Sequence, residues 1–99
     1  MFGQKIRKLR EARGIFQRQV AAILDVDIAY ISKMESEDKP VSKAHISKLA
    51  LLYGVQEDEL YTLWLAEKVY EVVKNHDFAL EAIEVAEAEI KSERKQKRS

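Results

Sequence analysis

Few side chains in this sequence of 99 residues could carry out catalysis or hold a metal ion. The two histidines, His45 and His76, lie far apart, and no cysteine is present to supply a thiolate. The sequence has no phosphate-binding loop and no spacing typical of metal ligands. The carboxylate next to His76, that of Asp77, is more simply explained as a helix N-cap. We therefore expect no enzyme activity, no cofactor and no metal.

A second set of side chains could instead contact the edges of DNA bases. If residues 27–35 form a helix whose apolar side is buried, its exposed side carries Ile28, Ala29, Ser32 and Lys33. A lysine can donate to guanine O6 or N7, a serine can pair with several bases, and apolar side chains can contact thymine methyl groups. Because this set is poor in hydrogen-bond donors, DNA shape would carry part of the specificity. The alternative is that these are ordinary surface residues.

Two short helices joined by a turn would position this set. Residues 17–24 have an apolar face, the turn is Asp25-Val26-Asp27, and Ile31 and Met34 supply the apolar face of the next helix. Asp27 is expected to cap that second helix. Two helices joined by three or four residues are typical of a helix-turn-helix, whose second helix enters the major groove.

Helical periodicity continues through the rest of the chain, which has one proline, three glycines and no strand-like alternation. Gly14 and Gly54 are expected to end helices, and Ser42 to cap one. The predicted helices span about residues 3–13, 17–24, 27–35, 42–53, 57–74 and 77–91.

A spaced set of matches runs through this helical region. Its members are Gln17, Ala21, Leu24, Val26, Ile31, Ser32, Glu35, Ile46, Leu49, Ala50 and Val55. In this order the sequence resembles the Cro/lambda-repressor (XRE-type) helix-turn-helix family over roughly residues 3–62. The resemblance implies an all-α fold: a five-helix lambda-repressor-like domain, here with an extended fifth helix and an additional C-terminal helix. It also implies that Gln17 contacts the DNA backbone or a base edge, and we assign it to the backbone contacts.

The sequence departs from the family pattern at three places. Phe16 stands where the family often has a serine or threonine cap, and Phe16 offers no capping oxygen. Asp25 stands where glycine is preferred, although Asp tolerates a left-handed backbone better than most residues. The acidic pair Glu37 and Asp38 replaces a glycine-containing loop and should repel nearby phosphate.

Charge is distributed unevenly along the chain. The formal net charge is zero, but residues 1–50 carry ten Lys and Arg against six Asp and Glu, a net +4. The segment 77–89 holds five acids and no Lys or Arg. The first half is therefore the candidate for contact with phosphates. The predicted backbone contacts, besides Gln17, are Arg18, Tyr30, Lys39 and Lys43. The basic residues of the first helix are interpreted as a solvated face: Arg7, Lys8, Arg10 and Arg13.

The helices after Val55 are predicted to form a dimer interface. Its expected residues are Leu60, Leu63, Trp64, Ile83 and Ala86. Trp64 would be the central anchor, since buried tryptophans often dominate interfaces; the alternative is that Trp64 belongs to the intramolecular core. Two-fold pairing would place two recognition helices about 34 Å apart on a palindromic operator.

Three segments are expected. Residues 1–56 form the helix-turn-helix DNA-binding domain, residues 57–91 the helical dimerisation extension, and residues 92–99 a disordered basic tail. The tail, with Lys95 and Lys97 among its charges, could alternatively contact DNA.

These features predict a homodimeric, sequence-specific transcription regulator that binds a palindromic operator in double-stranded DNA. The small size and the residues Asp27, Tyr30, Ile31 and Ser32 resemble the controller proteins of restriction-modification systems, which regulate their own operon. The alternative is an antitoxin-like or other protein-binding module that holds a partner with its C-terminal helices. No apolar run reaches about 18 residues and no signal peptide is evident, so we expect a cytoplasmic protein without a membrane partner.

Overall fold

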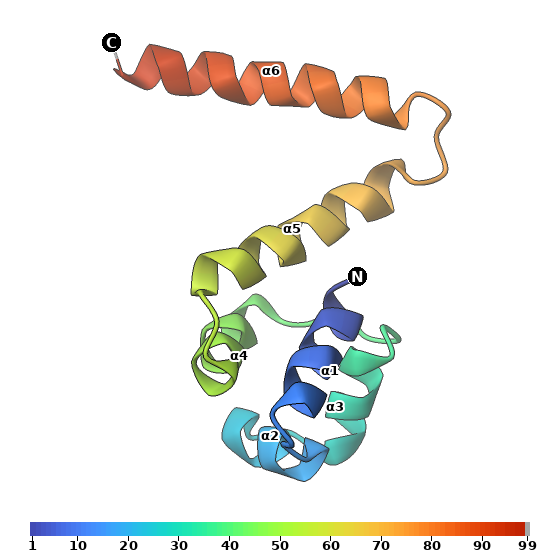
Figure 1. Ribbon diagram of the computed structural model, residues 1–99. Helices are drawn as coiled ribbons and strands as arrows, with labels where there is room; N and C mark the ends of the chain where they lie inside the picture. The colour runs from blue at the N-terminus through green and yellow to red at the C-terminus, as the bar shows by residue number, and fades with distance from the viewer. Residues whose placement is uncertain (99) are drawn as a thin grey trace. The chain divides into compact units, whose positions relative to one another are not determined.

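Six α-helices and one short 3₁₀ turn make up the described part of the chain, residues 1–98 of the computed structural model (Figure 1). No strand occurs among these residues, which confirms the all-α fold class. The elements are α1 (Phe2–Ala12), α2 (Gln17–Leu24), α3 (Ile28–Glu35), η1 (Lys43–His45), α4 (Ile46–Tyr53), α5 (Glu57–Val73) and α6 (Ala79–Arg98).

The chain divides into two compact units, and the first spans Met1–Lys68. Its helices α1 and α3 lie side by side in Figure 1, and α2 packs on α3. Their apolar faces meet in one hydrophobic core, whose burial from water is the main force that stabilises such a domain. The buried apolar residues are Phe2, Ile6, Val20, Ala21, Leu24, Ile31, Met34, Val41, Ile46, Leu49, Ala50, Tyr53 and Leu60.

Helix α1 approaches the end of α3 so closely that only glycine fits at position 3. A Cβ atom at Gly3 would lie 2.4 Å from the carbonyl oxygen of Met34 and 3.0 Å from that of Glu35. Such separations are far inside van der Waals contact, so a larger residue would force the helices apart. Gly3 therefore fixes the position of α3, the predicted recognition helix, against α1.

The turn between α2 and α3 is built around a left-handed residue. Asp25 has φ 56° and ψ 52°, and the N–H of Val26 donates to the carbonyl oxygen of Ala21 at 3.0 Å. This geometry ends α2 and lets Val26 pack against the core. Asp27 lies at the N-cap of α3 but its side chain makes no capping hydrogen bond, so the prediction of a side-chain cap there was wrong.

Helix α2 begins without a capping oxygen at its N-cap, Phe16, as predicted. The opposite half of a capping box is present, because Gln19 Oε1 accepts from the N–H of Phe16 at 2.7 Å. The predicted cap at Ser42 is also present: its Oγ accepts from the N–H of Ala44 at 3.3 Å.

The second unit begins at Val69, later than the boundary predicted at residue 56. The reason is that the first part of α5 packs on the core: Leu60 is fully buried, and Trp64 Nε1 donates to the carbonyl oxygen of Val41 at 2.8 Å. Helix α5 therefore belongs partly to each unit.

Helix α6 continues to Arg98, so residues 92–98 are helical where the sequence analysis expected disorder. This segment is rich in Glu, Lys, Arg and Gln, which have high helix propensity and extend a helix that has already nucleated. None of the helices within residues 1–98 combines the length and apolarity that crossing a bilayer would require.

Candidate nucleic-acid interface

Helix α3 turns one face to the core and the other to solvent. Ile31, Met34 and Glu35 are 0%, 1% and 4% exposed, and they anchor the helix. On the opposite face Ile28 is 52% exposed, too open for a core residue of its size. All four predicted base contacts lie on this open face: Ile28, Ala29, Ser32 and Lys33. The structure thus brings them together on one helical surface.

A buried ion pair holds α3 against α1. Arg10 Nε donates to Glu35 Oε2 at 2.7 Å, and Arg10 Nη2 donates to Glu35 Oε1 at 3.0 Å. The side chains are 13% and 3% exposed, so water screens their attraction poorly. The hydrogen bond to Glu35 raises the pKa of Arg10 although burial opposes it. Arg10 is therefore a structural residue, and its interpretation as part of a solvated basic face was wrong.

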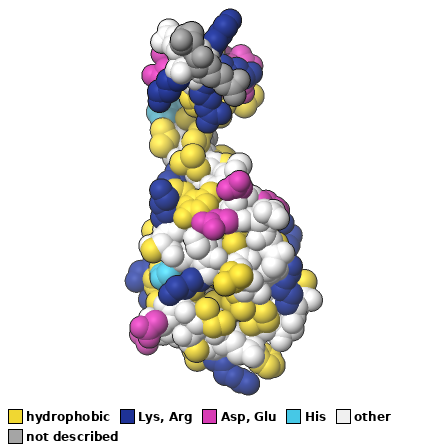
Figure 2. Space-filling model, turned by 90° about the vertical axis from the view of Figure 1, so that its left-hand side faces the viewer, with side chains coloured by type: hydrophobic (Ala, Val, Ile, Leu, Met, Phe, Trp, Pro, Cys, Tyr) yellow, Lys and Arg dark blue, Asp and Glu magenta, His cyan; other side chains and the backbone are white. Residues whose placement is uncertain are grey.

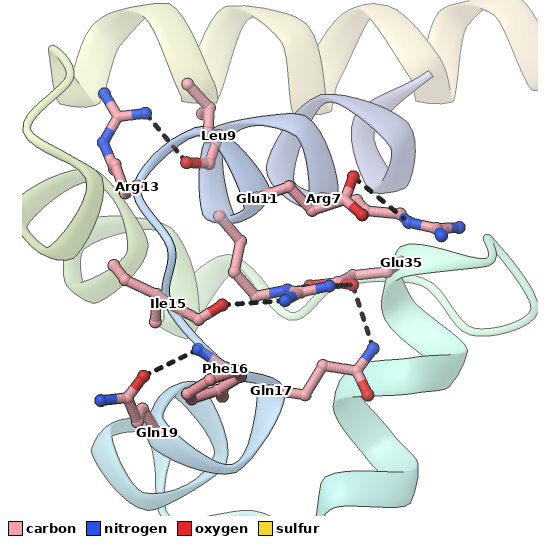
Figure 3. Close-up of polar contacts among 10 residues, drawn as sticks. Arg7, Leu9, Glu11, Arg13, Ile15, Phe16, Gln17, Gln19 and Glu35 are labelled. Atoms are coloured by element: carbon pink, nitrogen blue, oxygen red, sulfur yellow. Dashed lines mark hydrogen bonds and ion pairs between the residues drawn. The ribbon is translucent and has the colours of Figure 1, made fainter.

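The carboxylate of Glu35 also bonds to the start of α2. Gln17 Nε2 donates to Glu35 Oε1 at 3.1 Å, and Arg10 Nη1 donates to the carbonyl oxygen of Ile15 at 2.9 Å. Figure 3 shows Ile15, Gln17 and Glu35 converging from the α1–α2 loop, α2 and α3. The Glu35 cluster, defined as Arg10, Ile15, Gln17 and Glu35, thus sets the angle at which α2 and α3 meet.

Sequence reasoning missed the Glu35 cluster, although a signal was present. Glu35 lies four residues after Ile31, on the same face of α3, and Arg10 lies four residues after Ile6 on the apolar face of α1. A charged residue on the buried face of a helix needs a partner of opposite charge. The two residues are each other's partners, which the helical period alone did not reveal.

The predicted backbone contacts surround α3 on several elements. Arg18 is exposed at the start of α2, with its guanidinium carbon 4.6 Å from the centroid of the Phe16 ring. Gln17 is half-buried because it reaches Glu35. A side-chain amide has two N–H donors, so one of them is left for a phosphate.

An aromatic and basic group lies beside α3. Lys39 Nζ is 5.6 Å from the centroid of the Tyr30 ring, and the edge of His45 meets Tyr30 at a centroid distance of 5.8 Å. Lys43 Nζ lies 5.9 Å from the centroid of the Tyr61 ring, so it is associated with α5. Sequence reasoning weighed His45 only as a catalytic or metal-binding residue and did not place it beside α3; its buried Nδ1 has no hydrogen-bond partner within the part of the chain described here.

The residues predicted for a dimer interface fall into two groups. Leu60 is fully buried in the core of its own chain, so its assignment to an interface was wrong. Leu63 and Trp64 are partly buried against the same core, and the indole N–H of Trp64 is already bonded to Val41. Ile83 and Ala86 are exposed on α6. The first half of α5 packs on the core of its own chain because it covers apolar surface that α4 leaves open.

Metal-binding side chains do not gather in residues 1–98: no group of three or more His, Cys, Asp or Glu could hold an ion there. The α2–α3 region presents an exposed, partly basic helical face, held in place by the Glu35 cluster. Such a face suits insertion into a groove.

Comparisons with known proteins agree with this geometry. The sequence profile of the helix-turn-helix family matches residues 6–60. Control protein C.MunI of a Mycoplasma species is 34% identical over 62 residues, which cover 62% of this chain and 84% of C.MunI. The crystal structure of the restriction-modification controller protein C.AhdI from Aeromonas hydrophila shares 36% identity and a TM-score of 0.54, covering 60% of this chain and 89% of C.AhdI.

A longer regulator also matches. The HTH-type transcriptional regulator RamB of Mycobacterium tuberculosis is 27% identical over 92 residues, which cover 86% of this chain. The chain spans 19% of the length of RamB. The extent of the family match and the buried and exposed faces of α2 and α3 show that this chain belongs to the XRE-type helix-turn-helix family of DNA-binding regulators.

Proposed function

We propose that this protein is a sequence-specific DNA-binding transcription regulator of the restriction-modification controller type, which controls its own operon. The observation that carries the proposal is the exposed face of α3, with Ile28, Ala29, Ser32 and Lys33 held on a helix that the Glu35 cluster fixes in place. Its similarity to C.MunI and C.AhdI supports the controller type.

Base recognition would come from the start and middle of α3. Lys33 would donate to guanine O6 or N7, and Ser32 would exchange hydrogen bonds with a neighbouring base. Ile28 and Ala29 would contact thymine methyl groups. Because only two of these four side chains can form hydrogen bonds, DNA shape would contribute to specificity.

Phosphate contacts would position α3 in the major groove. Arg18 and the free amide N–H of Gln17 would bind one strand at the start of α2, and Lys39, Tyr30 and Lys43 would bind on the other side of α3. A homodimer would read a palindrome with two such surfaces. The protein would act as a binding protein without enzyme activity or a cofactor, in the cytoplasm where its operon lies. No observation favours the antitoxin-like alternative.

The test is binding to the DNA upstream of the protein's own gene, measured by fluorescence anisotropy against a scrambled duplex at physiological salt. We expect a preference of roughly 10³-fold or more. Weak binding that ignores sequence and disappears as salt rises would overturn the proposal.

Two lysine variants sharpen this test. Lys33→Ala should weaken binding to the operator by about 1–3 kcal/mol and relax the preference at one base pair. Lys74→Ala, which removes the same charge outside the helix-turn-helix domain, should leave the preference unchanged. If both variants weaken operator binding equally, Lys33 contributes only non-specific charge attraction to DNA.

A further inference from the structure

An open apolar groove runs along the second unit. It has a volume of about 590 Å³, and its walls include Val69 and Val73 at the end of α5 and Ile83, Ala86 and Ile90 on α6. Figure 2 shows hydrophobic side chains at the surface of this part of the chain as well as on the first unit. The groove is separate from the α3 surface, since none of its lining residues belongs to α2 or α3.

Among the described residues of the second unit, no side chain covers this groove. The side chains from Leu80 to Lys97 are all exposed, including Ile83 at 37% and Ile90 at 52%. Two helices of this kind do not bury enough apolar surface to remain folded alone, because helix stability in proteins comes mostly from packing of the apolar face. A partner in the groove would supply the missing apolar contact.

The charges of α6 indicate what that partner is. Segment 77–89 holds five acids and no Lys or Arg, whereas segment 91–98 holds five Lys and Arg and one Glu. Two copies of such a helix attract each other when they run antiparallel, because each acidic half then faces a basic half. In a parallel pair, like charges would face each other.

The apolar spacing of α6 gives the register. Ala79, Ile83, Ala86 and Ile90 are separated by four, three and four residues, the spacing of a coiled-coil seam, and the charged residues Glu93 and Lys97 continue that spacing. If Ala86 packs on Ile90 of the second copy, Ala79 lies opposite Lys97. The aliphatic stems of Lys91 and Arg94, which line the groove, would then cover apolar surface of the other copy while their charges reach its acids.

We propose that the groove binds helix α6 of a second copy of this chain, in antiparallel orientation, so that the two second units form a four-helix bundle. This dimer would join two recognition helices, and in that role it rests on the proposed function. The self-association itself can be measured without DNA, so the two proposals can fail separately.

Disulfide cross-linking tests the orientation, and the chain has no cysteine of its own to confuse the result. Ala79→Cys and Lys97→Cys proteins should cross-link at least tenfold more when mixed than either does alone. Lys48→Cys, on an exposed position of α4, is the control and should not cross-link. Efficient cross-linking of each variant with itself would show a parallel pair and overturn the proposal.

Sedimentation equilibrium of the full chain tests the surface. Ile90→Asp should raise the dissociation constant of the dimer at least tenfold, whereas Val85→Asp, which is 71% exposed and outside the groove, should change it less than threefold. Equal effects would place the interface elsewhere. If the wild-type chain stays monomeric at about 50 µM, self-association is too weak to support the proposal. That result would reject self-association and assign the groove to another partner.

Discussion

The two units of this chain differ in what they do with their apolar residues. The first unit buries large side chains such as Phe2, Ile31 and Tyr53 almost completely. The second leaves Val72, Leu80 and Val85 more than 70% exposed. The helix-turn-helix domain therefore contains its own core, whereas the C-terminal helices leave much of their apolar surface exposed. The first unit's stability should therefore be independent of protein concentration.

The units also differ in their ion pairs. The pair between Arg10 and Glu35 is buried, while those of Lys74 with Glu71 and Lys91 with Glu87 lie on the helix surface at three or four residues' spacing. Removing one partner of a buried pair leaves an uncompensated charge in the core. Surface pairs contribute little. An ion pair thus determines how helices pack in the first unit, whereas the ion pairs of the second unit contribute little to stability.

The largest expected effect comes from breaking the buried pair. Glu35→Ala should lower the free energy of unfolding by about 3–5 kcal/mol, because Arg10 would remain buried without a carboxylate. Urea denaturation measures the change. The control is Glu11→Ala, which removes a surface partner of Arg7 and should change stability by less than about 0.5 kcal/mol. A loss below about 1 kcal/mol for Glu35→Ala would show that the pair does not hold the domain together.

A pair of leucine variants compares the two units directly. Leu60→Ala should destabilise the first unit by about 2–5 kcal/mol, since Leu60 is fully buried and its loss leaves a cavity. Leu80→Ala, at 74% exposure, should stay within about 0.5 kcal/mol. Thermal unfolding followed by circular dichroism gives both values. Similar losses would mean that Leu80 is covered by a partner in solution.

The core of the first unit should also respond to alkaline pH. Burial, and secondarily the charge of Glu35, raises the pKa of Tyr53 from 10.0 to about 12. Between these values the unfolded chain loses the tyrosine proton and the folded chain keeps it, so stability falls as pH rises. The difference between the pKa of Tyr53 in the unfolded chain and in the folded chain corresponds to about 2–3 kcal/mol of folding free energy. Urea titrations at pH 9 and about pH 12 should show this loss in the wild type.

Tyr53→Phe is the control for that pH dependence. The phenylalanine variant should lose less stability over the same range, because it has no proton to release at this position. Tyr70→Phe, which removes a hydroxyl from a half-exposed residue of the second unit, should keep the wild-type slope. Parallel slopes in all three proteins would contradict the assignment to Tyr53.

The smallest effect is expected at the turn between α2 and α3. Asp25→Gly should stabilise the first unit by about 0.5 kcal/mol, because glycine adopts φ near 56° without a steric penalty. Differential scanning calorimetry would detect the rise in Tm. A lower Tm would show that the Asp25 side chain makes a contribution larger than its backbone strain.

The helix-turn-helix itself could be predicted because it depends on local patterns. Helical periodicity places Ile28 and Lys33 opposite Ile31 and Met34, whatever the rest of the fold does. The left-handed residue at Asp25 follows from its place after the last apolar residue of α2, and the family match confirms the motif. These features are encoded within about ten residues of each position.

Other features could only be decided by tertiary structure. The roles of Arg10, Leu60 and Trp64 were misjudged or left open because each depends on a contact distant in sequence: with Glu35, with the core, and with Val41. A sequence shows that a helix has an apolar or basic face but not which element covers it. Long-range packing decided that the first half of α5 completes the core and that α6 keeps its apolar face open.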